Sequence, residues 1–149
     1  QIANSGDWSH IASSGDNSHI ATSGNWSKLA TSGNNSHIAT SGDWSQIATS
    51  GDWSQIANSG DNSQIATSGD YSHIASSGNY SQIELKGKQS VGANIGINGR
   101  IKGKKGNWIV LAEYKNGIPK SVKAIKIDGK KIKEDTWYKL KNGKFQEVK

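Results

Sequence analysis

A nine-residue repeat occupies the first half of the 149-residue chain. Glycine recurs every nine residues from Gly6 to Gly78, and a second position, from Ile2 to Ile83, holds isoleucine in every unit except at Leu29. The unit reads I-A-[S/T/N]-S-G-[D/N]-[W/N/Y]-S-[H/Q/K]. A fixed period of this kind is typical of stacked repeats, in which each unit buries its apolar side chain only against its neighbours.

The composition of the repeats excludes a conventional globular core. Hydrophobic residues make up 32% of the chain, which contains one proline, Pro119, and no cysteine. Disordered segments also have low hydrophobicity, but they lack strictly spaced isoleucine and glycine. Without cysteine, the chain has neither disulfides nor thiolate metal sites. No apolar run is long enough to cross a bilayer, so we expect no membrane span.

Each unit is expected to form a short strand and then a turn. In the unit around Ile11 the isoleucine points inward and its neighbours alternate, while Ser-Gly-Asp/Asn forms the turn, with glycine supplying positive φ. One unit gives a perimeter of about 30 Å, which is too small to enclose side chains. We therefore predict an all-β fold, a parallel β-solenoid (β-roll) with two repeats per coil; three per coil is the alternative. Ser and Ala would let the opposing walls approach closely.

We expect two parts, a solenoid over residues 1–106 and a small basic β-rich cap over residues 107–149. The repeat is regular to about residue 83 and degenerate after it, with Ile95, Ile101 and Ile109 continuing the packing of about five coils. In the cap the pattern predicts strands at 108–114, 122–127, 137–140 and 145–148, with hairpin turns at Asn116-Gly117 and Asn142-Gly143. The chain has no methionine and begins within a unit, so we expect a processed or truncated product with further repeats upstream.

Charge is divided between the two parts. Through residue 83 the chain has six Asp and one Lys, a charge of −5, whereas beyond it seventeen Lys and Arg face six Asp and Glu, a charge of +11. The candidate basic patch comprises Arg100, Lys102, Lys104, Lys105, Lys130, Lys131 and Lys133. One interpretation is a surface for nucleic acid or an acidic partner. The other, which we favour, is a solvated edge that discourages aggregation, because the lysines alternate with strand positions.

The first variable position of the unit places aromatic and amide side chains in outward rows. With two repeats per coil, Trp8, Trp26 and Trp44 stack on one side, and Asn17 and Asn35 stack on the other. The candidate contact ladder comprises Trp8, Trp26, Trp44, Trp53, Tyr71 and Tyr80. One interpretation is a flat platform for sugars or nucleic-acid bases. We favour the other, in which the rings cover the turns and rigidify the coil, since asparagines interrupt the row.

No set of residues predicts a catalytic, cofactor or metal site. His10, His19, His37 and His73 share one variable position, but a metal site needs more ligands of fixed geometry. The turn aspartates invite comparison with calcium-binding nonapeptide β-rolls, which need a second Gly and a second Asp in each unit. In this chain Ser9 and its equivalents occupy the position of the second calcium ligand, so we expect no calcium site. The aspartates could instead form an acidic stripe that mimics a nucleic-acid backbone. A catalytic residue occupies a singular position, whereas these residues recur, so we expect no enzyme and no cofactor.

The chain also resembles a known group of proteins. The iterated I-A-x-S-G-[D/N]-x-S unit, followed by G-N-W-I at 106–109, L-A-E-Y at 111–114, I-D-G at 127–129 and D-T-W-Y-K-L at 135–140, resembles uncharacterised nonapeptide-repeat proteins of phages and gut Firmicutes. The S-x-I-A-x-S-G segment is similar to the head repeats of trimeric autotransporter adhesins, which form β-rolls. The first resemblance implies a phage or mobile-element protein, located in the host cytoplasm or the virion.

These observations predict a non-enzymatic, repeat-built binding or scaffold protein. In one reading it is a virion or surface rod, a homo-oligomer that binds a glycan or another macromolecule. In a second it is a phage-encoded inhibitor of a host defence system such as CRISPR, which occupies a nucleic-acid site or sequesters a ligand. A third alternative is ice binding through threonine rows that order water: Thr22, Thr31, Thr40, Thr49 and Thr67.

Overall fold

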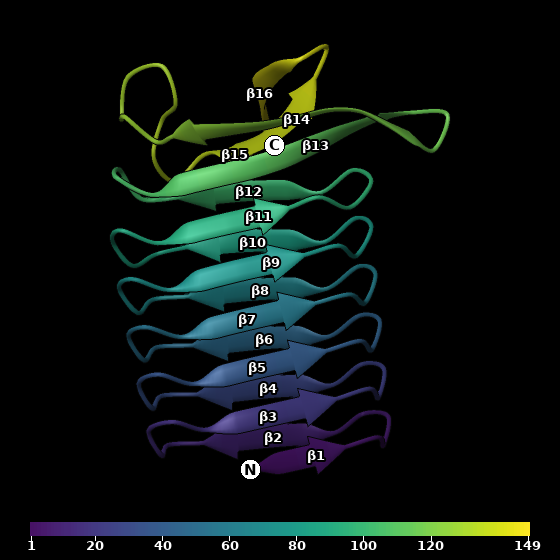
Figure 1. The fold of residues 1–149 in the computed structure, drawn as a ribbon, viewed down its shortest axis with the longest axis vertical. Coiled ribbons are helices and arrows are strands. Elements are labelled where there is room, and N and C mark those ends of the chain that lie inside the picture. Colours follow the sequence, from purple (N-terminus) through teal and green to yellow (C-terminus); the bar gives the residue numbers. More distant parts are fainter.

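A computed structural model describes all residues, 1–149, and consists of strands and turns without a helix (Figure 1). The strands stack along a rod, and the chain crosses to the opposite wall at each turn (Figure 1). Ile2 pairs with Ile20 and Ile11 pairs with Leu29, so equivalent positions lie two repeats apart. The predicted β-solenoid with two repeats per coil is therefore confirmed. The structure contains no helix with the length and apolar character that a membrane crossing requires.

Two eight-stranded sheets form the opposite walls, and we call them sheet A and sheet B. Sheet A contains, in spatial order, β1 (Ile2–Asn4), β3 (His19–Thr22), β5 (His37–Thr40), β7 (Gln55–Asn58), β9 (His73–Ser76), β11 (Val91–Asn94), β13 (Trp108–Lys115) and β14 (Ile118–Lys126). Sheet B contains β2 (His10–Ser13), β4 (Lys28–Thr31), β6 (Gln46–Thr49), β8 (Gln64–Thr67), β10 (Gln82–Leu85), β12 (Arg100–Gly103), β15 (Trp137–Lys141) and β16 (Lys144–Val148). β1 to β12 form six coils, one more than expected.

The interior is a column of aliphatic side chains bordered by small polar ones. In β6, Ile47 and Thr49 are buried while Gln46 and Ala48 are exposed. The serine that precedes each strand from β4 to β11 is also buried; the hydroxyl of Ser45 donates to the carbonyl oxygen of Gly42 at 2.9 Å. The expectation that alanine lies between the walls is wrong, because the alternation of the strand turns it outward. Serine and threonine fill the space instead.

The repeat glycine has a different role from the one predicted. None of the glycines in the regular repeats has positive φ; the residue two positions later does, with φ of 58° at Trp26 and 53° at Asn35. A Cβ atom built on Gly24 would lie 2.0 Å from the carbonyl oxygen of Gly6 in the preceding coil. Successive coils therefore approach so closely at this corner that only glycine fits.

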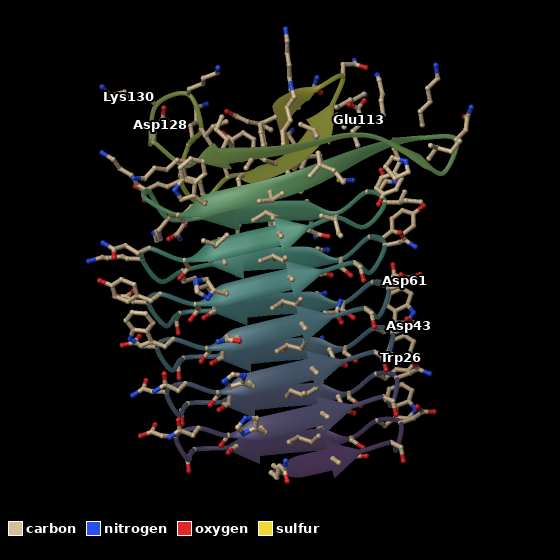
Figure 2. All side chains as sticks on the ribbon, in the orientation of Figure 1. Trp26, Asp43, Asp61, Glu113, Asp128 and Lys130 are labelled. Carbon is tan, nitrogen blue, oxygen red and sulfur yellow. The ribbon has the colours of Figure 1, made fainter.

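The Asp or Asn after each glycine joins successive coils. Oδ1 of Asp43 accepts a hydrogen bond from the backbone N–H of Asp61 at 2.7 Å, and Oδ1 of Asn25 accepts one from the N–H of Asp43 at 2.8 Å. Figure 2 shows Asp43 and Asp61 along one edge of the rod. Since Asp and Asn both carry this acceptor oxygen, either residue continues the ladder.

Two hairpins close the C-terminal end of the rod. β13 pairs in parallel with β11 and antiparallel with β14, while β15 pairs antiparallel with β12 and β16. Both residues of each two-residue turn, Asn116-Gly117 and Asn142-Gly143, have positive φ, as such hairpins require, so the predicted turns are confirmed. Sheet A crosses residue 106 without a break, and the division into two domains stays a prediction.

In the degenerate coils a glycine and a leucine at neighbouring inward positions compensate for each other in size and keep the core filled. Ile101 and Ile109 are fully buried as expected, but Ile95 is 43% exposed, so its predicted place in the packing is wrong. Gly92 takes the inward position of β11, which Ile74 occupies in the neighbouring strand β9. A Cβ atom on Gly92 would lie 3.1 Å from Leu85, whose larger side chain replaces the usual threonine and fills the space.

Candidate functional site

The candidate contact ladder is divided between two edges of the rod. Residues at this position that lie two repeats apart share an edge, so Trp8, Trp26 and Trp44 stack on one edge, with ring centroids 5.2 and 5.0 Å apart. Trp53 and Tyr71 stack at 4.5 Å on the other edge. Tyr80 lies on the edge of Trp44 but is separated from it by Asn62. The predicted stack of three tryptophans is confirmed, but the six residues do not form one row.

Stacking covers part of the aromatic surface that could contact a ligand. Neighbouring rings are nearly parallel, with interplanar angles of 5° to 7°, so each ring of a pair covers one face of the other. Sugars and bases bind aromatic platforms through the ring face. Only Trp26, on the rim of the rod (Figure 2), has an aromatic ring on both sides, whereas each of the other stacked rings has such a neighbour on one side. This geometry favours a role in rigidifying the turns.

Most of the candidate basic patch is engaged in ion pairs or hydrogen bonds within the chain. Lys102 pairs with Glu84 at 2.9 Å, Lys104 with Asp135 at 2.6 Å and Lys133 with Glu147 at 2.9 Å. These hydrogen-bonded carboxylates raise the pKa of Lys104 and of Lys133. The guanidinium of Arg100 lies 4.6 Å from the ring centre of Trp137 and donates to the side-chain oxygen of Gln82 at 2.9 Å.

Lys105, Lys130 and Lys131 are exposed and make no ion pair. The last two lie in a loop that Asp128 organises: its Oδ1 accepts the backbone N–H groups of Ile132 at 3.0 Å and Lys130 at 2.8 Å. These bonds lower the pKa of the Asp128 carboxyl, so the loop is held by a charged group. Figure 2 shows Lys130 projecting from this loop. The free positive charge of the patch is concentrated here.

The histidines and turn aspartates are arranged as ladders. His19 and His37 stack at 4.8 Å on sheet A, where Gln55 separates them from His73, and His10 lies on sheet B. The structure contains no cluster of three or more His, Asp or Glu side chains placed to hold a metal ion.

The threonine rows face the interior. Thr22, Thr40 and Thr67 are at most 5% exposed, and Thr31 and Thr49 are equally buried. The proposal that these threonines order water on an exterior face is therefore wrong. They occupy the second inward position of each strand, because a strand of four residues that buries its isoleucine also buries the residue two positions later.

A further surface was not singled out from the sequence. Three rows of side chains run along the outside of sheet A, and we call this surface face A. The first row is His19, His37, Gln55, His73 and Val91; the second is Ala3, Ala21, Ala39, Ala57, Ala75 and Ala93; the third is Ser5, Ser23, Ser41, Ser59, Ser77 and Ile95. A shallow groove lies on each side of the alanine row. Face A carries no charged side chain over six coils.

Face A continues at the cap into apolar residues and one lysine, Lys126, which pairs with Trp108. Val91 pairs with Trp108 and Ala112 pairs with Val122, and Trp108 and Val122 are 46% and 56% exposed. The outside of sheet B, which we call face B, differs, since Lys28 interrupts it and five charged side chains occupy its last two coils: Glu84, Lys86, Arg100, Lys102 and Lys104. The sequence shows this difference when odd-numbered repeats are compared with even-numbered ones, because the former build sheet A and the latter build sheet B.

Comparisons with protein-family models, with curated proteins and with solved structures find no match for this chain.

Proposed function

We propose that the protein is a non-enzymatic, repeat-built binding scaffold that contacts its partner through face A. The absence of charge from this face over six coils carries the proposal. Side chains with charge are depleted from the centres of protein interfaces, whereas aromatic residues are enriched there. Face A combines an uncharged flat centre with exposed apolar residues at one end, such as Ile95 and Trp108. Face B provides the internal comparison, because the same backbone there carries charged side chains.

The distribution of reactive side chains supports a binding role. Serine, histidine and aspartate recur with the repeat, and each type occupies an equivalent environment in successive coils. Catalysis requires a particular set of groups in one place, with different roles. The ladder geometry provides repeated equal contacts instead, which suits recognition of an extended surface with a regular repeat.

The proposal is tested by placing one charge on each face. Ala57 in β7 and Ala48 in β6 are both exposed and both follow Gln-Ile, so they form a matched pair on faces A and B. Capture from host lysate, followed by mass spectrometry, is expected to lose its specific partner with Ala57→Arg and to retain it with Ala48→Arg. Equal capture by both variants, with unchanged circular dichroism, would show that face A is not the contact surface.

A second candidate function rests on the free lysines of the cap. Lys105, Lys130 and Lys131 lack carboxylate partners, in contrast to the other lysines of the basic patch. This favours the defence-inhibitor hypothesis in its nucleic-acid form, in which the free lysines of the cap bind the phosphates of a nucleic acid and so occupy its site. The rod would then act as a spacer. A phage or mobile-element origin, implied by the resemblance, suits both candidates.

A further inference from the structure

The three rows of face A differ in height, and this makes the face complementary to itself. His and Gln side chains form a tall row along one side, alanines form a low central row, and serines form a low row on the other side. Alternate residues of a strand are about 6.6 Å apart, so the tall row stands about 13 Å from the serine row. A flat partner would contact only the tall row.

We propose that a second copy of this chain covers face A, forming a dimer in which the two rods lie side by side with their caps at the same end. This inference rests on the proposed function of face A and names its partner. A two-fold axis along the rods places the tall row of each copy over the serine row of the other, and alanine over alanine. Such an interface uses the same patch on both copies. Rods running in opposite directions would instead set tall row against tall row.

The axial spacing of the rows favours the same partner. Equivalent side chains recur at each coil, one strand spacing or about 4.8 Å apart. Favourable contacts repeat along the whole face only when the partner has the same spacing. A second solenoid of this sequence meets that condition in every coil, and with its sheet packed face to face it corresponds to the aligned packing of two β-sheets.

The size of face A agrees with a dimer of moderate stability. Strands of four to five residues give a width of about 15 Å, and seven strands give a length of about 34 Å, so each copy contributes about 500 Å². The total of about 1,000 Å² is near the lower limit for specific interfaces. The exposed Trp108 and Ile95 extend the apolar part of the contact. We therefore expect a dimer that dissociates on dilution.

Sedimentation of the purified full chain over a range of concentrations tests the inference. We expect a monomer–dimer equilibrium that Ala57→Arg shifts at least tenfold toward monomer and that Ala48→Arg leaves unchanged. Ser41→Arg and Ser50→Arg form a second matched pair on the two faces, and circular dichroism confirms folding of each variant. A wild-type chain that stays monomeric, or a dimer that only the face B variants disrupt, would overturn the inference.

The relative direction of the rods has its own test, because the chain has no cysteine. Ala21→Cys lies on face A near one end, and Ala12→Cys is its counterpart on face B. A short bis-maleimide should join two copies of Ala21→Cys and not of Ala12→Cys. Cross-linking only of a mixture of Ala21→Cys and Ala75→Cys would show antiparallel rods and contradict the arrangement.

If self-association is absent but Ala57→Arg still abolishes capture from lysate, the proposed function stands and only the dimer fails.

Discussion

At the scale of the residue, the position after each turn Asp or Asn has an unusual backbone. Its φ lies between 53° and 60° from Trp8 to Asn98, in the left-handed region that suits asparagine and costs other residues energy. Tryptophan and tyrosine occupy it nevertheless, and their stacked rings offset part of that cost. This explains why this position of the regular units holds either Asn or an aromatic residue.

Substitutions at Trp44 distinguish the effect of its backbone conformation on stability from the effect of its stacked ring. Trp44→Asn removes the stack with Trp26 but keeps a residue suited to positive φ, whereas Trp44→Val removes the stack and adds a β-branched side chain where φ is 58°. We expect Val to lower the free energy of unfolding by about 1–3 kcal/mol more than Asn. Urea denaturation measures the difference. Equal stability of the two variants would contradict a steric role for this position.

The glycine corner gives a second prediction at this scale. A Cβ atom on Gly51 would lie 2.0 Å from the carbonyl oxygen of Gly33, whereas one on Gly15 would meet only Ser18 Oγ at 3.7 Å. Gly51→Ala should therefore destabilise the fold by about 1–3 kcal/mol, as overpacking does, while Gly15→Ala should have little effect. Thermal unfolding of the two variants checks this. A large loss in Gly15→Ala would mean that backbone conformation, not the close approach of coils, selects glycine.

At the scale of the element, one side chain joins the two hairpins of the cap. Glu113 on β13 accepts the backbone N–H of Asn142 at Oε1 and that of Gly143 at Oε2, both at 2.8 Å. It thereby ties sheet A to the β15–β16 turn. Figure 2 shows Glu113 at the cap end of the rod. The hydrogen bond from Gly143 is the main cause of the lowered pKa of Glu113, with a further contribution from Asn142 and Lys120.

The lowered pKa of Glu113 predicts how the cap responds to acid. A depressed pKa means that the carboxylate stabilises the folded state at pH values above its unfolded pKa, and that this is lost as the pH falls through the folded value. Glu113→Gln should lower the melting temperature at neutral pH, with a difference from wild type that shrinks below the ordinary glutamate pKa. Calorimetry across that range measures it. A difference independent of pH would show that charge is not involved.

At the scale of the whole molecule, the excess positive charge lies at one end of the rod. If the cap binds nucleic acid, Lys130→Glu should weaken binding to a random-sequence DNA several-fold and lower the slope of log affinity against log salt by about one. Lys28→Glu changes the net charge equally but lies in the solenoid, so it serves as the control. Fluorescence anisotropy at several salt concentrations distinguishes them. Equal effects of both changes would indicate only a general charge effect.

The sequence predicts the solenoid well because its signals are periodic. The spacing of isoleucine from Ile2 to Ile83 predicts stacked coils, the length of one unit favours two repeats per coil over one, and the Asn-Gly turns are sufficient for both hairpins. The role of Gly24 was missed because it depends on the distance between successive coils, which no local pattern gives, whereas the burial of Thr22 was missed although the alternation of a strand that buries Ile20 implies it. The ion pairs of Lys102 and Lys104 join residues of different coils and hairpins, and no local pattern predicts them.

Because each coil holds two repeats, an even change in the number of repeats has a different consequence from an odd one. Adding or removing two units leaves each later unit on its own sheet, and the Gly, Asp and Ile ladders remain in register. Adding or removing one unit moves every later unit to the opposite wall. The side of the rod that carries no charge before the change would then continue as the charged side after it. Relatives that differ in length by an even number of units would keep both sides intact, whereas an odd change would have to be balanced by a second one.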